Sequence, residues 1–417
     1  KWSGRFLPGK CPVPVFWEGI QMKAVMYGAG NIGRGFIGAL LSQTGYEVVF
    51  VDVNDDVVNT INRDKTYPQE IVGENGKTVW IENIRAVDGK DTSTVSDEIA
   101  SANLLATSVG VTVLEKIIPV ICEGLTRRWD KDPDNTLDLL ICENLMDANE
   151  FLNERIKDTL PDRHKKTLDE SLGLVETSIG RMVPVMTEAM KKGDPLRICV
   201  EEYDYLPVDR AAFKGPIPDY EKIVPFSPFS FYLERKLYIH NMAHAVTAFL
   251  GGIKGYTYID ESIGDIYIRK LVEGAMIESA MMISKKYHVE FSELKAHIDD
   301  LLFRFQNPDL HDTVERVGRE PIRKLKPKDR LVGALRGCEQ EGILPVYLSF
   351  SIAAALYNIT DASAHELLNE TCQISSDEPC GSYIMAFYEK LKNSPKDFAS
   401  ILKMIDRQYN EIRGPVI

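Results

Sequence analysis

The sequence predicts an α/β protein in which a doubly wound, mainly parallel sheet domain is followed by a mostly α-helical domain. Short β-branched runs alternate with amphipathic segments from Met22 to about residue 205, which is typical of βαβ units. Beyond residue 230 the strand patterns almost disappear and long helical patterns dominate, such as those at 231–250, 262–287 and 343–358. The length of 417 residues allows for such a division into domains.

The expected strands are short and rich in aliphatic residues. They cover residues 23–27, 47–52, 103–108, 137–142, 172–177 and 196–202. Strand-like pieces around Asn75-Gly76 also predict a β-hairpin, since this dipeptide favours tight turns. Pro and Gly residues gather between 205 and 228. We therefore expect one domain at residues 22–205 and the other at 206–417.

Residues 1–21 differ from the rest of the chain. They contain three prolines and two tryptophans without a periodic pattern, and Met22 directly precedes the first expected strand. We expect Met22 to be the natural start and residues 1–21 to be an extension outside the fold. The segment lacks the apolar run of a secretory signal.

Charge and cysteine content restrict the possible partners. The formal charge of −13 argues against binding of a nucleic-acid polymer. Seven scattered cysteines without a CxxC pair suggest neither a disulfide framework nor a zinc finger, and a reducing, cytoplasmic setting is expected. The uncharged run at 342–360 contains Pro345 and several polar residues, so we interpret it as a buried helix and expect no membrane span. Monomer and dimer both remain open.

A glycine-rich turn follows the first expected strand. Residues 23–40 read KAVMYGAGNIGRGFIGAL, in which Gly28, Gly30 and Gly33 form GxGxxG at a strand–helix junction. This context is typical of a Rossmann-like dinucleotide site, and Asp52 at the end of the next strand would bind a ribose hydroxyl. A carboxylate there would repel a 2′-phosphate, so NAD is expected rather than NADP. The expected cofactor-binding residues are Gly28, Ala29, Gly30, Asn31, Ile32, Gly33 and Asp52.

The segment 231–250 predicts a helix that bears three polar groups. At about 100° per residue, Asn241 and His244 would lie about 140° and 80° from Lys236. A partly desolvated Lys beside an amide and an imidazole could take the proton from an alcohol as hydride leaves. The spacing alone favours the simpler interpretation, a Lys at a helix edge with satisfied Asn and His side chains.

A local basic segment interrupts the acidic chain. Residues 316–330 hold seven Lys or Arg residues and two acids. Arg316, Arg319 and Arg323 could bind a phosphate through charge-assisted hydrogen bonds. A solvated charged face or an ion-pairing segment would have the same composition.

Several separate motifs in the chain resemble those of one protein family. They are MKAVMYGAGNIGRGFIG at the start, CENL at 142–145, ERKLYIHNMAHA around Lys236, and FQNPDLHDTVERVGREPIRKL at 305–325. From Met22 onward the chain resembles the polyol-specific long-chain dehydrogenase family, and most of all its members that act on mannitol 1-phosphate. The resemblance implies NAD-dependent interconversion of D-mannitol 1-phosphate and D-fructose 6-phosphate, without a metal.

The resemblance also implies roles for individual residues. Lys236 matches the general acid/base, Asn241 an oxyanion-binding amide and His244 a substrate-orienting residue. Asn144 of CENL matches a second asparagine near the substrate oxygen. Arg181 is a candidate for substrate contact, although Gly180 stands where the family often has Asp.

Other activities remain open at this level. A hexuronate reductase or a free-polyol dehydrogenase of the same family would share the Lys–Asn–His set. The basic segment favours a phosphate only weakly, because a uronate carboxylate also attracts Arg. A regulatory protein that senses NAD without turnover is the alternative from another class.

Overall fold

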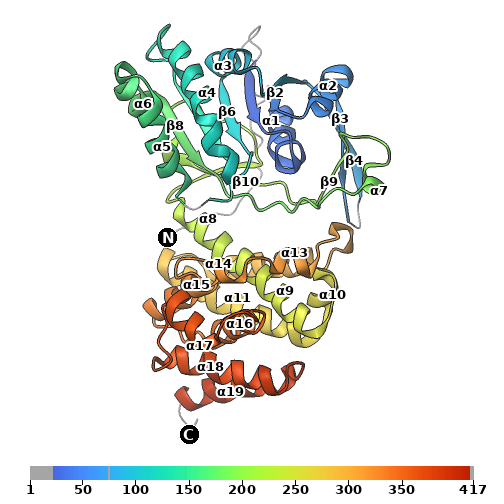
Figure 1. Ribbon diagram of the computed structural model, residues 1–417, viewed down its shortest axis with the longest axis vertical. Coiled ribbons are helices and arrows are strands. Elements are labelled where there is room, and N and C mark those ends of the chain that lie inside the picture. The colour runs from blue at the N-terminus through green and yellow to red at the C-terminus, as the bar shows by residue number, and fades with distance from the viewer. Residues whose placement is uncertain (1–21, 74–75, 146, 414–417) are drawn as a thin grey trace.

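The computed structural model describes residues 22–73, 76–145 and 147–413, which form a sheet domain and a helical domain (Figure 1). The expected extension at 1–21 and Asn75 of the expected turn lie outside the described residues. The predicted fold class is confirmed, with a parallel sheet in the first domain and helices in the second.

A six-stranded parallel sheet is the centre of the first domain. Its strand order is β5-β2-β1-β6-β7-β8, so the order reverses between β1 and β6. Ligands of such sheets bind outside the carboxyl ends of the strands at this reversal. The strands are β1 (Lys23–Tyr27), β2 (Glu47–Asp52), β5 (Ile84–Asp88), β6 (Leu104–Thr107), β7 (Leu137–Ile141) and β8 (Leu172–Glu176).

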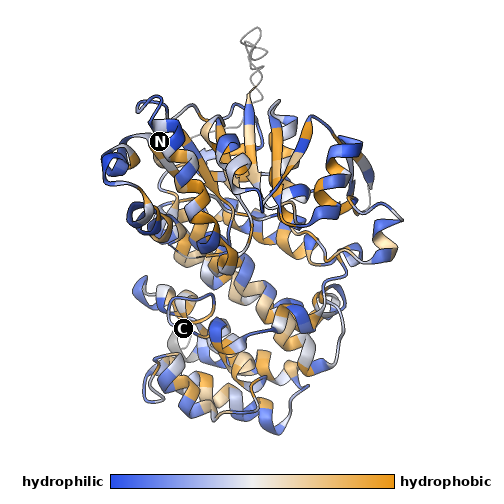
Figure 2. Cartoon of the chain, turned by 45° about the horizontal axis from the view of Figure 1, so that its top comes forward, coloured by the Kyte–Doolittle hydropathy of each residue, from blue (hydrophilic) through white to orange (hydrophobic). Residues whose placement is uncertain are grey.

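Both faces of this sheet are buried, which explains why the central positions of its strands are mostly apolar on both faces. In β1, Ala24 and Met26 pack into one core, while Val25 and Tyr27 pack into the core on the other face. Figure 2 shows the hydrophobic residues concentrated on the strands and on the inner sides of the helices. The first face is covered by η1 (Gly33–Ile37), α1 (Gly38–Gln43) and α2 (Asp55–Asp64), and the second by α3 (Thr92–Ala100), α4 (Val111–Trp129), α5 (Ala148–Thr159) and α6 (Lys165–Ser171).

A smaller sheet of order β4-β3-β9 lies beside the main one. The antiparallel pair β3 (Tyr67–Ile71) and β4 (Lys77–Ile81) confirms the expected hairpin, with a connection longer than a two-residue turn. The run at 196–202 was expected among the main parallel strands, but its strand β9 (Ile198–Val200) pairs with β3 instead. Strand β5 takes a place in the main sheet, where the sequence pattern predicted only a strand-like piece.

Residues just beyond the expected domain boundary pack with the sheet domain. Strands β10 (Leu206–Asp209) and β11 (Ile223–Phe226) pair in parallel, and Leu206, Val208 and Ile223 enter the core of the sheet domain. We therefore propose that the first domain ends near residue 227 rather than at 205. Short helices η2 (Asp162–His164), α7 (Glu188–Lys191) and η3 (Arg210–Ala212) complete it.

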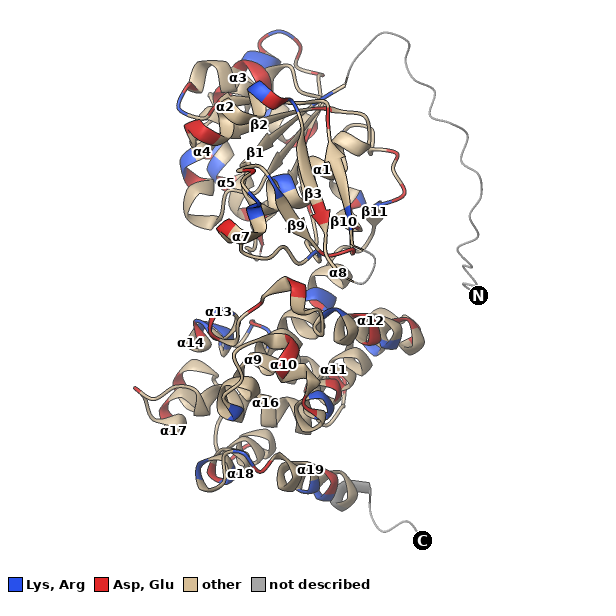
Figure 3. Ribbon diagram, turned by 90° about the vertical axis from the view of Figure 1, so that its right-hand side faces the viewer, with Lys and Arg blue, Asp and Glu red and all other residues tan. Residues whose placement is uncertain are grey.

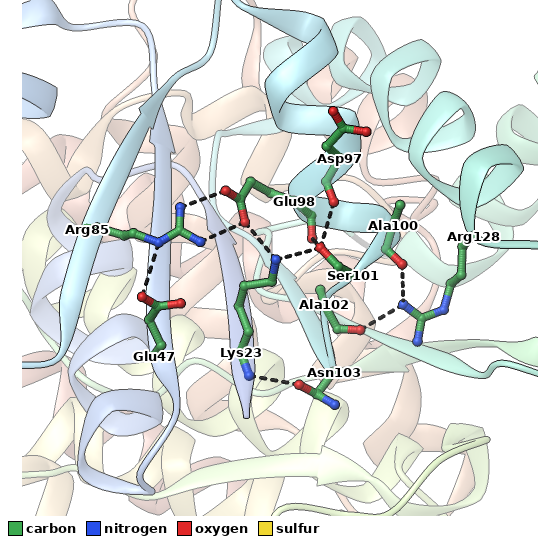
Figure 4. A network of polar contacts seen from close by, with 10 residues as sticks. All are labelled: Lys23, Glu47, Arg85, Asp97, Glu98, Ala100, Ser101, Ala102, Asn103 and Arg128. Atoms are coloured by element: carbon green, nitrogen blue, oxygen red, sulfur yellow. Dashed lines mark hydrogen bonds and ion pairs between the residues drawn. The ribbon is translucent and has the colours of Figure 1, made fainter. Parts of the chain in front are cut away.

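The amino ends of the strands are held by an ion-pair network (Figure 4). Nζ of Lys23 lies 2.7 Å from Glu98, whose carboxylate also accepts two hydrogen bonds from Arg85, of 2.7 and 2.8 Å. Burial would raise the pKa of Glu98, but these two cations lower it. The network lies at the amino ends of β1 and β5, at the edge of the sheet opposite the glycine-rich turn.

The helical domain encloses one large apolar core. The expected buried helix at 343–358 corresponds to α16 (Val346–Tyr357). It packs against α9 (Met242–Lys254), α11 (Ile266–Tyr287) and α18 (Pro379–Asn393). Buried Glu278 accepts hydrogen bonds from the N–H groups of Tyr347 and Leu348 and so caps this helix. No helix in the described part of the chain has the length and apolar character needed to span a membrane.

The remaining helices of this domain begin or end at other residues than the sequence pattern predicted. The expected helix at 262–287 is divided at Asp265, whose side chain caps a new helix by accepting from the N–H groups of Tyr267 and Ile268. Acidic and basic residues are interspersed along its outer helices in Figure 3. The other elements are α8 (Ser230–Arg235), η4 (Lys236–Asn241), α9 (Met242–Lys254), α10 (Ile259–Gly264), α11 (Ile266–Tyr287), α12 (Phe291–Arg304), η5 (Pro308–Leu310), α13 (Val314–Gly318), α14 (Pro321–Lys324), α15 (Val332–Gln340), α17 (Ala364–Glu366), η6 (Leu367–Thr371), α18 (Pro379–Asn393) and α19 (Phe398–Arg413).

Candidate active site

The glycine-rich turn leaves β1 with the backbone that a dinucleotide site needs. Gly28 has φ of +100°, and a Cβ there would lie 2.6 Å from the carbonyl oxygen of Ser108. A Cβ on Gly33 would lie 1.9 Å from the carbonyl oxygen of Gly28, whereas Gly30 faces open space. The first and third glycines are thus required for close packing, and the second leaves room for a pyrophosphate.

Polar contacts hold this turn against the next strand. Oδ2 of Asp52 accepts a hydrogen bond of 2.8 Å from the N–H of Ala29. The buried guanidinium of Arg34 donates to the carbonyl oxygen of Ala29 at 2.7 Å. The amide of Asn31 donates to the carbonyl oxygen of Pro184 at 3.2 Å. The turn is therefore fixed by its own side chains, with Asp52 at the place where a ribose would lie.

The helix that carries Lys236, Asn241 and His244 is not a regular α-helix. Helix α8 continues into the π-helical segment η4 (Lys236–Asn241) and then into α9. The angular positions expected from 100° per residue are therefore wrong, because a π-helical turn contains more residues than an α-helical one. Single π-helical turns inside α-helices are frequent at functional sites. Here the wide turn begins at Lys236 and ends at Asn241.

A cleft between the two domains gathers most of the expected residues. It has a volume of about 720 Å³ and receives Ile32 and Ser108 from the sheet domain beside the glycine-rich turn. A smaller cavity of about 80 Å³ shares Asn144, Lys236 and Asn241 with the cleft and adds Arg323 and Arg330. The expected catalytic and substrate-binding residues that line the main cleft are Asn144, Arg181, Lys236, Asn241, His244, Arg316 and Arg319.

Lys236 lies where both cavities meet, and its amine is poorly solvated. Burial first, and then the positive charge of Arg330, lower the pKa of Lys236 to about 8, while Cys142 opposes this shift. An amine with such a pKa is available as a base near neutral pH. Arg330 was part of the basic segment but was not among the residues expected at the site.

Asn144 follows β7 and is positioned by its neighbour Glu143. The carboxylate of Glu143 accepts hydrogen bonds of 2.8 Å from the N–H groups of both Val109 and Gly110, which follow β6. Burial raises the pKa of Glu143, and these two hydrogen bonds oppose that shift. Glu143 thus joins the loops after two neighbouring strands at the mouth of the cofactor site. It stood in the CENL motif, but its partners are 34 and 33 residues away in sequence.

His244 is part of a contact that the sequence did not reveal. Its ring stacks on Phe305 with centroids 5.0 Å apart. Its Nε2 lies 2.8 Å from Oδ2 of Asp312, and Oδ1 of Asp312 accepts from Nε and an Nη of Arg316 at 2.8 and 2.5 Å. Burial would raise the pKa of Asp312, but the contacts with His244 and Arg316 lower it overall. Asp312 is therefore a carboxylate at neutral pH.

Arg181 forms hydrogen bonds within the cleft wall. Its guanidinium donates to the carbonyl oxygen of Glu201 at 3.0 and 2.8 Å and to that of Gly35 at 3.4 Å. Burial lowers the pKa of Arg181 to about 10. Because its donors face backbone oxygens, a contact of Arg181 with substrate remains a prediction.

A second buried arginine joins the two domains at the same wall. Arg304 of α12 lies 2.5 Å from the carboxylate of Glu201 and donates to the carbonyl oxygen of Gly180 at 2.5 Å. Its guanidinium also stacks on the ring of Tyr203, 4.3 Å from the centroid. A Cβ on Gly180 would lie 3.0 Å from this ring. The Gly that replaces the family's acid is thus explained by close packing at the domain interface.

The three arginines expected to bind phosphate differ in whether they are already paired with a carboxylate. Arg316 is paired with Asp312, and Arg323 lies 3.2 Å from Glu320 and 3.4 Å from Asp329. The exposed guanidinium of Arg319 has no ion-pair partner among the described residues and lines the main cleft. Arg319 is therefore the most available of the three for an anion.

Comparison with known proteins matches two domains of one family to this chain. Residues 22–222 match the mannitol dehydrogenase Rossmann domain, and residues 229–403 match the mannitol dehydrogenase C-terminal domain. The chain belongs to the mannitol dehydrogenase family. This family comprises NAD-dependent polyol dehydrogenases, in agreement with the NAD expected from the sequence.

Two solved structures of similar fold cover almost the whole chain. A substrate-free D-sorbitol dehydrogenase has a TM-score of 0.76 at 14% identity and covers 92% of this chain and 95% of its own. The mannitol 2-dehydrogenase of Pseudomonas fluorescens, solved with NAD and D-mannitol, has a TM-score of 0.68 at 13% identity, with 93% and 94% covered. At these identities the likeness concerns the fold.

In this member of the mannitol dehydrogenase family, the preference for NAD or NADP tests the role expected for Asp52. We expect kcat/KM to be much higher with NAD than with NADP, because the Asp52 carboxylate would repel a 2′-phosphate. Asp52→Ala should reduce this preference, whereas Asp56→Ala on the exposed start of α2 should leave it unchanged. Equal use of both cofactors by the native protein would refute the assignment.

The pH dependence of turnover tests Lys236. Alcohol oxidation needs the neutral amine, so kcat/KM should rise with pH and level off above about 8, while carbonyl reduction should fall over the same range. Arg330→Leu should move this midpoint upward because it removes a charge that lowers the pKa of Lys236. Arg330→Lys, which keeps the charge, serves as the control.

In Lys236→Met the rate should drop by about 100-fold or more and lose this pH dependence. A midpoint that stays unchanged in Arg330→Leu would contradict the electrostatic account. Near-native turnover of Lys236→Met would contradict the assignment of the base.

Proposed function

We propose that the chain is an NAD-dependent polyol-phosphate dehydrogenase that interconverts D-mannitol 1-phosphate and D-fructose 6-phosphate, the activity of a mannitol-1-phosphate 5-dehydrogenase. One observation carries this proposal. The desolvated amine of Lys236 and the amides of Asn144 and Asn241 line one cleft, which also reaches the glycine-rich turn and Arg319. An acid–base group, oxyanion donors, a cofactor turn and a cation for phosphate thus share a single space.

Each residue of the cleft would have a separate role in alcohol oxidation. Bound NAD supplies the acceptor for the hydride that leaves the carbinol carbon. Lys236 takes the hydroxyl proton as this C–H bond breaks and the C=O bond forms. Asn144 and Asn241 would donate hydrogen bonds to the substrate oxygen and stabilise its developing negative charge. In the reverse direction Lys236 returns the proton to the alkoxide.

The glycine-rich turn supports the cofactor assignment. The open face of Gly30 and the carboxylate of Asp52 fit a pyrophosphate and a ribose diol, respectively. Ser108 and Gly110, which follow β6, line the cleft between this turn and Lys236. These residues occupy the place where the strand order reverses, the usual cofactor crevice of such sheets.

The phosphate part of the proposal is supported by the uncompensated charge of Arg319. In an acidic chain, an arginine on a cleft wall that has no carboxylate partner within the described ranges is suited to an anionic substrate group. Arg316 lies on the same wall, and its side chain is 44% exposed. The pairing of Arg323 with two acids makes it a weaker candidate.

The cysteines support the expected setting. Those within the described residues, from Cys122 to Cys380, are all buried free thiols. We propose a reducing, cytoplasmic compartment on this basis.

Charge reversal at Arg319 tests the substrate. Arg319→Glu should raise KM for fructose 6-phosphate by about 10- to 100-fold, because a charge-assisted hydrogen bond contributes about 1.5–3 kcal/mol. KM for fructose should change little. Arg407→Glu on the exposed face of α19 is the matched control and should affect neither substrate.

NADH oxidation is to be measured with fructose 6-phosphate, fructose, fructuronate and tagaturonate. A preference for a uronate or for fructose would replace the phosphate proposal by one of the two family alternatives. Absence of turnover with every substrate, together with tight NADH binding, would favour the sensing role. Equal effects of Arg319→Glu on fructose and its phosphate would also argue against phosphate binding.

A further inference from the structure

Asp312 lies between two groups that face the substrate cleft. Its side chain is only 10% exposed, and the side chain of His244 is 17% exposed. One carboxylate oxygen meets Nε2 of His244, and the other meets the guanidinium of Arg316. Neither the base nor the oxyanion donors contact this carboxylate in the described structure.

The backbone around Asp312 is fixed from both sides. Its carbonyl oxygen accepts a hydrogen bond of 2.9 Å from the N–H of Ile259. Thr313 forms an antiparallel bridge with Tyr258, and its hydroxyl accepts from the N–H of Arg316 at the start of α13. A carboxylate held in this way can determine where its partners lie, because it has little freedom to follow them.

The contact also determines which nitrogen of His244 bears a proton. A bare nitrogen lone pair 2.8 Å from a carboxylate oxygen would be repelled, so Nε2 must carry the hydrogen. The ring stacks on Phe305 with an interplanar angle of 19°, which restrains its orientation. Among the described residues Nε2 has no well-aligned hydrogen-bond acceptor, so the contact with Asp312 is mainly electrostatic. Nδ1 is then the nitrogen left to meet a substrate hydroxyl.

We propose that Asp312 is a positioning residue that fixes His244 with its proton on Nε2 and holds Arg316 on the cleft wall. One carboxylate would thereby set both the group that orients the polyol chain and a cation near its charged end. The inference rests on the proposed function for its effect on catalysis, but the state of the His244 ring is independent of any substrate.

The expected kinetic effect follows from misplacement of His244. Asp312→Asn should lower kcat/KM for fructose 6-phosphate by about 100-fold, the cost of a small displacement of a substrate-positioning group. In a His244→Ala background the same change should cost less than about threefold, because Asp312 would have lost the group through which it acts. Asp312→Glu should recover part of the activity.

Asp299→Asn is the matched control, since Asp299 forms an exposed i, i+4 pair with Lys295 on the neighbouring helix α12. It should leave kcat and KM unchanged. A loss of equal size in the native and His244→Ala backgrounds would overturn the proposal. Should Asp312→Asn fail to fold, Asp312→Glu in the two backgrounds provides the same comparison.

The ring itself can be observed without substrate. In protein labelled with ¹⁵N in its histidines, the His244 signals, assigned with His244→Ala, should show a protonated Nε2 and an unprotonated Nδ1 at pH above 8. Asp312→Asn should alter this pattern. A proton on Nδ1 in the native protein would refute the inference, whereas the expected ring state without turnover of any polyol would refute only the proposed function.

Discussion

The desolvation of one lysine amine is the constraint on which the site depends. Lys236 must leave water to act as a base near neutral pH, yet a buried ammonium without compensation is costly. The chain resolves this by ending α8 at Arg235 and opening a π-helical turn at Lys236, where two cavities meet. Arg330 supplies a like charge that favours the neutral amine further. The π-helical turn that interrupts the regular α-helix thus also places the Lys236 amine where it can act as a base.

The surrounding walls are held by charges that do not take part in the chemistry. Glu143 joins the loops after β6 and β7, while Arg304 and Glu201 join the two domains behind the cleft. Asp312 joins α9 to the basic segment. These buried or half-buried carboxylates have partners on both oxygens, as buried charges require. A cleft between two domains can therefore hold its polar groups in fixed positions.

Much of the fold followed from local sequence patterns, and much of the site did not. The glycine-rich turn and the strands at 23–27 and 47–52 were predicted because their signals are short-range. The pairing of β9 with β3 was missed, since a strand pattern does not reveal its partner. The π-helical turn was missed because residues 231–250 also fit an α-helical period. Asp312 and Glu143 depend on partners far away in sequence, and only the i, i+4 spacing of Asp312 and Arg316 gave a local signal.

The most direct measurement is a titration of the Lys236 amine itself, followed by ¹³C NMR of protein labelled at the lysine ε-carbons. Lys324, whose pKa burial also lowers to about 8, is separated by a Lys324→Met variant, and Lys236→Met identifies the signal of interest. The account predicts that this signal titrates near pH 8, well below the ordinary lysine value of 10.5. A Lys236 signal that titrates near 10.5 would contradict it.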